Sequence, residues 1–305
     1  MSDYRPDELV DPRNAEIRVW VGDRLWPRDE ARVSVFDSSV QGGDAVWEGL
    51  RVYDGKVFRL GDHLARLLDS ARALRFEPLP DLDQVRRALF ATLEANGMRD
   101  GAHVRLTLTR GPKLTSGMSP RFNRKGTCLI VLAEWKPPVY DPGGIRLITS
   151  SIRRNSRQCL DSRIHHNNLL NNILAKLEAD AAGVDDAVML DLQGFVAETN
   201  ATNIFMVENG ELATPIADGC LPGITRRVVL EVARAAQIPT SERRLTPAEL
   251  WAADELFTTG TMGELSPVLE IDGREIGGGG AGPVTRRLQE LFHQRTASEG
   301  EPLPF

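Results

Sequence analysis

A proline-rich segment, Lys136-Pro-Pro-Val-Tyr-Asp-Pro142, interrupts the middle of this 305-residue chain. Proline fixes φ and has no N–H to donate, so the segment is stiff, extended and unable to continue a β-sheet. The chain is also longer than one ordinary core requires. The sequence therefore predicts an N-terminal domain over residues 1–136, a linker over 137–143 and a larger C-terminal domain over 144–305.

Composition places the chain among ordinary globular proteins. Hydrophobic residues make up 41% and charged residues 26%, and the net charge of -6 offers no basic surface for nucleic acid. The sequence has no run of about 18 apolar residues, and its polar first residues lack the apolar core of a signal peptide. Three widely spaced cysteines fit reduced thiols better than a disulfide framework. We expect a cytoplasmic protein without membrane or nucleic-acid partners.

Short apolar stretches in the first part predict strands joined by tight turns. They cover residues 17–21, 33–36, 49–53, 57–58 and 128–132, with Asp54-Gly55 as a hairpin turn. Apolar residues at helical spacing predict helices over 64–74 and 82–93, and Asn96-Gly97 ends the second helix. The first domain is therefore expected to be mixed α/β.

The stretch from His103 to Arg110 alternates between apolar and polar residues. Successive side chains of a strand point to opposite faces of its sheet, so one face is expected to join the core and the other to line a polar cleft. The apolar face carries Val104, Leu106 and Leu108, and the polar face carries His103, Arg105, Thr107 and Thr109.

The second part also mixes strands and helices. Strands are expected over 145–148, 187–190 and 204–207, followed by the hairpin signal Asn209-Gly210. Helices are expected over 169–182, ending at Gly183, over 225–236, and after the capping-box sequence Thr246-Pro-Ala-Glu249. Four glycines, 277–280, predict a turn because no P-loop lysine follows them. The whole chain is expected to have an α/β (α+β) fold.

Two small-residue turns stand where elements begin or end, Leu221-Pro-Gly-Ile-Thr225 and Thr258-Thr-Gly-Thr261. Backbone N–H groups at a helix N-terminus that follows glycine can bind an anion, and nearby hydroxyls can complete a phosphate site. The alternative is that Gly223 and Thr225 only begin and cap a helix.

Four segments in this order resemble class IV aminotransferases of fold type IV, the group that contains branched-chain aminotransferases, D-amino acid aminotransferase and aminodeoxychorismate lyase. The segments are Val46-Trp-Glu-Gly-Leu-Arg51, His63-Leu-Ala-Arg66, Leu190 to Phe205, and Leu221-Pro-Gly-Ile-Thr-Arg226. The resemblance implies a small N-terminal α/β sandwich, a larger C-terminal pseudo-barrel that carries the cofactor site, and a homodimer. It also implies pyridoxal or pyridoxamine phosphate as cofactor and an amino acid or keto acid as substrate.

The resemblance assigns cofactor roles to particular positions. Arg66 matches the arginine that holds the cofactor phosphate, and Glu198 matches the carboxylate that pairs with the pyridine nitrogen. The alternatives are a solvated helix arginine and a surface glutamate. Further expected cofactor contacts lie in the matching segments and turns: Asn203, Gly223, Ile224, Thr225, Gly260 and Thr261.

Substrate contacts are expected from Trp47, Arg105, Arg110 and Met262. Arg105 resembles an arginine of the branched-chain enzymes and Arg110 one of the D-amino acid enzyme, although an ordinary ion pair is an equal alternative for each. Gly42 and Leu169 stand where the branched-chain enzymes have tyrosines, so the sequence departs from the branched-chain pattern at these two positions.

The lysine that such enzymes use for the Schiff base and for proton transfer is missing. The sequence has no lysine between Lys136 and Lys176, and different alignments place His165, Ile164 or Arg163 at the position. Histidine can move protons near neutral pH but forms no stable imine, and arginine is a feeble nucleophile, so His165 is the candidate base and Arg163 the other candidate. His165 and the adjacent His166 would point to opposite faces, so no metal site is expected.

These residues lead to one main hypothesis and three alternatives. The main hypothesis is an aminotransferase-like protein that binds the cofactor noncovalently and has altered chemistry. The alternatives are a catalytically silent ligand-binding relative, a lyase of the aminodeoxychorismate lyase type, and an ordinary aminotransferase that carries a lysine substitution.

Overall fold

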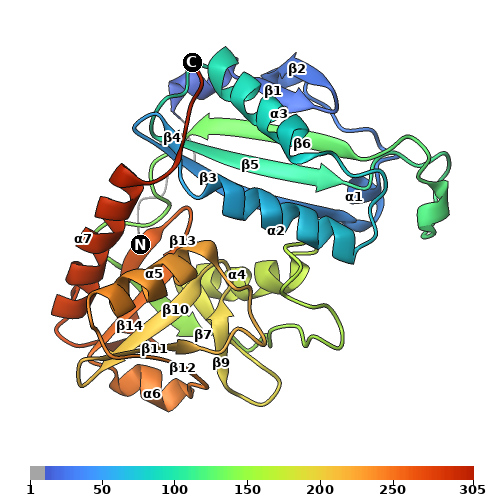
Figure 1. Cartoon of the computed structure of the whole chain (residues 1–305). Coiled ribbons are helices and arrows are strands. Elements are labelled where there is room, and N and C mark those ends of the chain that lie inside the picture. Colours follow the sequence, from blue (N-terminus) through green and yellow to red (C-terminus); the bar gives the residue numbers. More distant parts are fainter. Residues whose placement is uncertain (1–10) are drawn as a thin grey trace. The chain divides into compact units, whose positions relative to one another are not determined.

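The structure is a computed structural model that describes residues 11–305. These residues form two compact units, each with its own β-sheet and helices (Figure 1). The N-terminal unit comprises the described residues up to Pro137 together with Ile164–Asn168 and Thr296–Phe305, and the C-terminal unit comprises Pro138–Arg163 and Leu169–Arg295. The mixed α/β character expected from the sequence is confirmed in both units.

The N-terminal unit is built on a seven-stranded sheet of order β16-β4-β3-β5-β6-β1-β2, in which every neighbouring pair is antiparallel. The Asp54-Gly55 turn between β3 and β4 has positive φ at both residues, as a tight hairpin turn requires. The strands are β1 (Arg18–Val21), β2 (Arg24–Pro27), β3 (Ala45–Tyr53), β4 (Lys56–Val57), β5 (Ala102–Thr109), β6 (Cys128–Trp135) and β16 (Glu301–Pro302).

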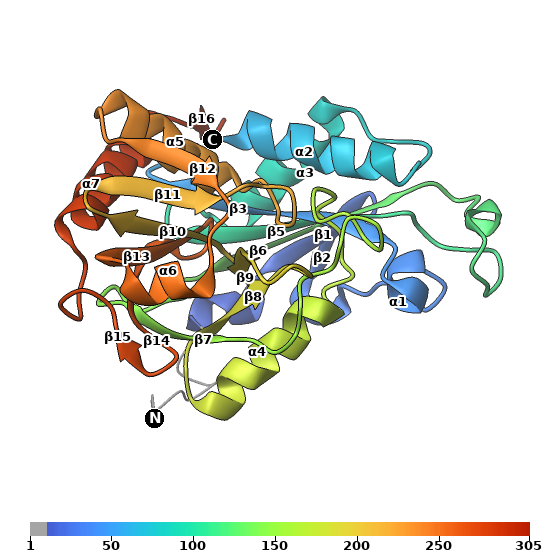
Figure 2. The same ribbon diagram turned by 90° about the horizontal axis from the view of Figure 1, so that it is seen from below.

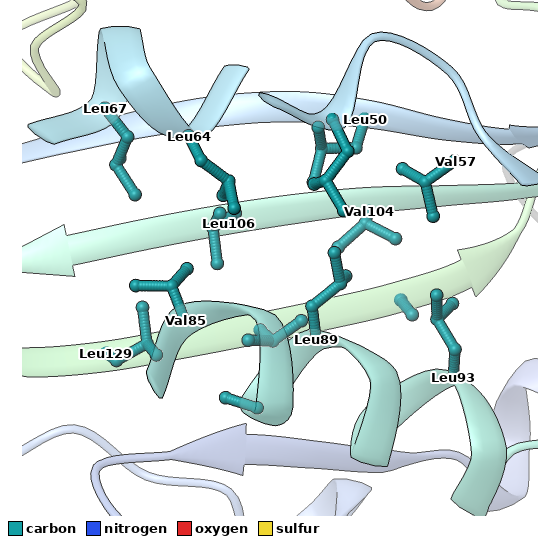
Figure 3. Close-up of a cluster of buried hydrophobic side chains, with 14 of the residues drawn as sticks. Leu50, Val57, Leu64, Leu67, Val85, Leu89, Leu93, Val104, Leu106 and Leu129 are labelled. Atoms are coloured by element: carbon teal, nitrogen blue, oxygen red, sulfur yellow. The ribbon is translucent and has the colours of Figure 1, made fainter. Parts of the chain in front are cut away.

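Helices α2 (Leu60–Ala73) and α3 (Leu82–Ala95) bury their apolar sides against this sheet. Figure 3 shows Leu64 and Leu67 from α2 and Leu89 and Leu93 from α3 pointing into one cluster with Val104 and Leu106 of β5. The expected division of β5 into an apolar and a polar face is therefore confirmed for its core side. Shorter helices are α1 (Ser38–Gly42) and the 3-10 turns Pro12–Glu16, Arg28–Glu30 and Pro120–Phe122.

The strand expected over 33–36 is wrong. The backbone N–H of Asp37 donates to the carbonyl of Ser34, which closes a turn, and Val35 and Phe36 are exposed. Asp37 then caps α1 by accepting from the N–H of Ser39. The apolar alternation was misleading because a strand also needs a pairing neighbour, and this stretch has none along its length in the part of the chain described.

The C-terminal unit contains a nine-stranded mixed sheet of order β12-β11-β10-β13-β14-β7-β8-β9, with β15 paired to β14. The pairs β11/β12, β14/β7 and β7/β8 are parallel, and the others are antiparallel. The strands are β7 (Ile145–Thr149), β8 (Asp186–Leu190), β9 (Val196–Thr199), β10 (Asn203–Glu208), β11 (Glu211–Pro215), β12 (Thr240–Arg243), β13 (Glu255–Gly260), β14 (Glu264–Ile271) and β15 (Arg274–Glu275).

Local sequence signals predicted the end of one helix of this unit and the start of another. Gly183 ends α4 (Leu170–Ala182) in the left-handed conformation, and Thr246 and Glu249 form the expected capping box of α6 (Pro247–Ala252). Helix α4 lies along β7 and β8, where Ala175 and Ala179 allow close packing (Figure 2). The remaining helices are α5 (Ile224–Ala235) and α7 (Pro283–Ser298).

The structure also bears on the expectations about membrane spans and cysteines. Within residues 11–305, no helix combines the length and the apolar character needed to cross a bilayer. Cys128, Cys159 and Cys220 are unpaired. A cytoplasmic location stays a prediction from the sequence.

The core of the N-terminal unit predicts the result of a cavity mutation. Leu89 is fully buried in α3, so Leu89→Ala is expected to lower the free energy of unfolding by about 2 to 5 kcal/mol in urea titrations. Leu82→Ala is the matched control, because this leucine of the same helix is exposed, and a loss of about 0.5 kcal/mol or less is expected. Equal losses in the two variants would contradict this view of the core.

Candidate functional site

The segment that should carry the missing lysine, Ile164–Asn168, packs within the N-terminal unit beside β3. The N–H of Trp47 donates to the carbonyl of His165 (2.9 Å), and the N–H of Asn167 donates to the carbonyl of Ala45 (2.9 Å). The N–H of His165 donates to the hydroxyl of Ser70 in α2 (3.1 Å). These bonds hold the backbone of His165 between a strand and a helix.

A fully buried carboxylate, Glu48 of β3, lies beside His165 and accepts hydrogen bonds from three side chains. Arg66 donates from Nε to Oε1 (2.8 Å) and from Nη2 to Oε2 (2.7 Å). His63 Nδ1 lies 2.7 Å from Oε2, and His165 Nδ1 lies 3.2 Å from Oε1. We call Glu48, His63, Arg66 and His165 the Glu48 cluster.

The environment sets the protonation of the cluster. Burial acts to raise the pKa of Glu48, but Arg66 and His165 outweigh it and hold that pKa well below its ordinary value. Burial lowers the pKa of His165 to about 4, against the opposing pull of Glu48, and Arg66 and Arg105 lower it further. At neutral pH Glu48 is therefore anionic, and His165 is a neutral imidazole that donates its Nδ1 proton to the carboxylate.

Two of the expected substrate-binding residues lie next to His165. The ring of Trp47 is 4.0 Å from the His165 ring between centroids, and the Arg105 guanidinium lies 3.4 Å from the Trp47 centroid. Arg105 also donates to the side chain of Asn167 (3.0 Å). Burial lowers the pKa of Arg105 to about 10, so it remains a cation at neutral pH. Trp47 and Arg105 therefore place an aromatic ring and a cation beside His165, the candidate base.

Arg110 has a different environment. Its guanidinium pairs with Asp44 (2.5 Å) and donates to the carbonyls of Leu74 (2.7 Å) and Arg75 (2.9 Å). These partners favour the ion-pair alternative, and a substrate role for Arg110 stays a prediction. Arg163 is exposed, with its backbone N–H on Asp161 (3.0 Å), whereas His165 is enclosed.

In the C-terminal unit, the expected cofactor carboxylate Glu198 is buried at the end of β9. Arg154 donates from Nε to its Oε1 (2.7 Å), while Asn203 Nδ2 (3.2 Å) and the N–H of Leu221 (3.3 Å) donate to Oε2. Burial raises the pKa of Glu198, and the charge of Arg154 opposes that rise. The Arg154 pair and the two amide donors compensate the charge of an ionised carboxylate at this position.

The N-terminus of α5 lies beside the same group. Asn203 Nδ2 also donates to the carbonyl of Leu221 (2.9 Å), and a Cβ at Gly223 would come 2.1 Å from Asn203 Oδ1. Gly223 is the N-cap and has no side chain to cap the helix, so the first amides of α5 remain suited to an external anion. Ile224 and Thr225 follow, and both are buried.

The second expected turn lies at the end of β13, whose neighbour β10 begins at Asn203. Asn203 is the cross-strand partner of Thr259, and a Cβ at Gly260 would lie 3.1 Å from Thr202 Cγ2. Thr261 and Met262 continue this turn, where the carbonyl of Met262 accepts from Val139 (3.0 Å). Glu198, Asn203 and Gly223 thus lie together, and Gly260 lies beside Thr202, the residue before Asn203. The other expected residues, Arg66, His165, Trp47 and Arg105, form a group in the N-terminal unit.

Sequence reasoning assigned no role to Glu48, His63 or Arg154. The signal for Glu48 was present, because it alternates in phase with Val46, Leu50 and Val52 on the buried face of β3. A charged residue in that phase requires a buried partner. Arg154 has no comparable signal, since it follows Arg153 in a stretch without periodicity.

Comparison with known proteins places this geometry in a family context. The family model "Amino-transferase class IV" matches residues 45–271. The chain is 61% identical over 300 residues to the branched-chain-amino-acid aminotransferase-like protein 2 of Arabidopsis thaliana, covering 98% of this chain but 54% of that protein, so it spans about half of the relative's length.

Two further comparisons cover both partners almost fully. The putative branched-chain-amino-acid aminotransferase of Methanocaldococcus jannaschii is 42% identical over 277 residues, which are 90% of this chain and 95% of that protein. The crystal structure of the T.th. branched-chain amino acid aminotransferase complexed with N-(5'-phosphopyridoxyl)-L-glutamate matches with a TM-score of 0.86 and 34% identity, covering 93% and 95% of the two chains. This match confirms the expected fold type.

The low pKa of His165 predicts a loss of stability in mild acid. Since this pKa is about 4 in the folded chain and 6.5 ordinarily, only the unfolded chain takes up the proton as pH falls from 6.5 towards 4. The group should therefore cost about 2 kcal/mol of unfolding free energy between pH 7 and pH 5. Urea titrations at both pH values are expected to show a correspondingly smaller loss in His165→Gln.

His293 provides a control, because its pKa is shifted in the opposite direction to that of His165. The hydrogen bond to Glu264 raises the pKa of His293, so this histidine contributes stability that is present in acid and lost as pH rises. His293→Gln should therefore not reduce the acid sensitivity. An identical loss in the wild-type chain and His165→Gln would contradict the assignment of a neutral, enclosed His165.

Proposed function

This chain belongs to the class IV aminotransferase family, and on that premise we propose that it binds pyridoxal or pyridoxamine 5'-phosphate and acts on an amino acid or its keto acid. Relatives support the cofactor, since solved structures of the T.th. aminotransferase contain N-(5'-phosphopyridoxyl)-L-glutamate and pyridoxamine 5'-phosphate. The observation that carries the proposal is the buried Glu198 carboxylate next to a helix N-terminus capped by Gly223.

The residues of the C-terminal unit fit this cofactor. The Glu198 carboxylate would pair with the protonated pyridine nitrogen, which lets the bound ring act as an electron sink. The first amides of α5 and the hydroxyls of Thr225 and Thr261 would hold the phosphate. The close approach of Gly223 to Asn203 leaves no room for a Cβ. The hydroxyls of Thr258 and Thr259 are buried without a hydrogen-bond partner among the described residues, so both could form hydrogen bonds to a bound ligand.

The N-terminal unit would supply the remaining roles. Arg66, which matches the family arginine for the cofactor phosphate, binds Glu48 through Nε and Nη2. Arg105, stacked on Trp47, would hold the carboxylate of the amino acid. Both assignments follow the family resemblance of these positions.

His165 would act as the proton acceptor in place of lysine. Its Nδ1 proton points to Glu48, so the lone pair lies on Nε2, and a neutral imidazole can accept a proton from the substrate α-carbon. Histidine supplies no covalent link, so the cofactor would be held by noncovalent contacts alone. The chemistry would accordingly be altered, with slow transamination or another reaction of amines.

Cofactor binding can be tested by absorption titration of the purified chain. Saturable spectral changes with pyridoxal or pyridoxamine phosphate are expected, and Gly223→Ala should weaken binding at least tenfold, about 1.4 kcal/mol, because its Cβ would meet Asn203. Gly219→Ala is the matched control in the same loop, since its Cβ would approach nothing closer than 4.0 Å. Absence of binding to the wild-type chain would overturn the proposal.

The noncovalent part of the proposal has its own readout. Borohydride reduction followed by peptide mapping should leave no cofactor on any lysine of the wild-type chain, whereas His165→Lys is the positive control for trapping. A lysine adduct in the wild-type chain would contradict noncovalent binding. Tight binding without turnover across a panel of amino donors would favour a ligand-binding protein over an enzyme.

A homodimer is part of the same proposal. Leu170, Ile173, Leu174 and Leu177 recur at helical spacing on α4 and are between 41% and 67% exposed, although they are apolar. Such a contiguous exposed stripe is typical of a protein interface. The outer side of α4 would therefore be covered by the second copy of the chain.

The α4 stripe predicts the effect of introducing charge. The double variant Ile173→Glu, Leu177→Glu should convert a dimer into a monomer by light scattering after size exclusion, because two carboxylates would be buried without partners. Leu192→Glu is the control, since Leu192 is 65% exposed in a turn of the same unit and lies outside the stripe. An unchanged mass of the double variant would exclude this surface as the interface.

A further inference from the structure

We infer that Glu48 is a positioning residue that fixes the tautomer and orientation of His165 and stabilises the positive charge that His165 acquires when Nε2 accepts a proton. This inference rests on the proposed role of His165. It assigns a reaction role to a residue of the N-terminal core that makes no cofactor contact in the proposal.

The hydrogen bond to Glu48 is the main contact that orients the His165 imidazole. The backbone of His165 is held by Trp47 and Ser70, so its side-chain torsions decide where the ring points. The ring then lies 4.0 Å from Trp47 on one side and directs Nδ1 at Glu48 Oε1 (3.2 Å). A carboxylate can only accept a hydrogen bond from neutral imidazole, so the proton must sit on Nδ1 and the lone pair on Nε2.

Charge makes Glu48 necessary for proton uptake. The charged groups around His165 are Glu48 from β3, Arg66 from α2 and Arg105 from β5, and the two arginines both oppose an imidazolium. Glu48 is the anion among these three. Removing its charge would leave His165 facing two cations in a buried site, where such repulsion is poorly screened.

Glu48 is itself held in place by the rest of the cluster. Arg66 binds both carboxylate oxygens in a fork, and His63 binds Oε2. The fork fixes the plane of the carboxylate, and Oε1 is the oxygen that Arg66 Nε and His165 Nδ1 share. Glu48 thus transmits a fixed orientation to the imidazole through one shared atom.

The proton balance of the step is simple. The C–H bond at the substrate α-carbon breaks, its electron pair stays on carbon, and the proton forms an N–H bond at Nε2. The Nδ1 proton stays on His165, and Glu48 stays ionised throughout. Return of the Nε2 proton to the substrate restores neutral imidazole, so no oxidant or further reactant is needed.

The tautomer can be measured without cofactor. Long-range ¹H–¹⁵N correlation spectra of the apo chain with ¹⁵N-histidine should show five histidines, and His165→Gln identifies the signal of His165. The expected wild-type result at pH 7 is a neutral ring protonated at Nδ1. A wild-type ring protonated at Nε2 would overturn the inference directly, with no variant required.

Substitution then tests the cause. In Glu48→Gln the His165 signal should move toward the other tautomer or a mixture, because the amide has one acceptor and competing donors. Glu264→Gln is a matched control, since Glu264 pairs with His293 (3.0 Å) in the C-terminal unit, and it should leave the His165 signal unchanged. A folded Glu48→Gln variant with an unchanged His165 tautomer would contradict the inference that Glu48 fixes this tautomer.

Kinetics separate this inference from the proposed function. Glu48→Gln is expected to lower kcat, measured at saturating cofactor, at least tenfold while KM for the amino acid changes less than about threefold, and Glu48→Asp should recover part of the loss. The double variant Glu48→Gln, His165→Gln should be no slower than His165→Gln alone. Full activity in His165→Gln would refute the role of His165 itself, whereas an inactive His165→Gln beside a fully active Glu48→Gln would refute only the role of Glu48.

Discussion

The buried carboxylate of Glu48 is the interaction on which the N-terminal unit depends most. An ion taken out of water costs several kcal/mol unless partners compensate it. Glu48 finds those partners in α2 and in the segment 164–168, so its charge ties together three stretches that are far apart in sequence. Loss of Arg66 would leave the buried charge of Glu48 without its cation, and loss of His165 would remove one of the hydrogen bonds that Glu48 accepts.

A second buried carboxylate, Glu198, organises the expected cofactor residues of the C-terminal unit. It also pairs with an arginine, Arg154, but its other donors are an amide side chain and a backbone N–H instead of histidines. This difference separates their chemistry. Glu198 adjoins an arginine and two amide donors and suits a fixed charge, whereas Glu48 adjoins the imidazole of His165 and suits the support of a proton-accepting group.

The Glu48 cluster matters for the proposed chemistry because the sequence has no lysine between Lys136 and Lys176. A lysine in this family would combine covalent attachment with proton transfer, and histidine can take over only the second task. The carboxylate, the aromatic ring and the arginines around His165 form an environment that sets its protonation. A protein of this family could therefore retain a defined acid–base group without the covalent link.

The sequence predicted part of the order of helices and strands, because apolar periodicity, the capping box at Thr246 and glycine at helix ends act over a few residues, but it did not predict α7 or the strands β12 to β14. The stretch 33–36 failed because strand formation needs a distant partner that local alternation does not reveal. Family motifs likewise indicated Glu198, Arg66 and the two turns, although their roles remain proposals. Only the tertiary structure decided that Glu48 meets His165, since 117 residues separate them and the match depends on how β3, α2 and the segment 164–168 pack. Local sequence determines periodicity and helix caps. The pairing of buried charges is decided by three-dimensional packing, because a charge requires a compensating partner only once packing has removed it from water.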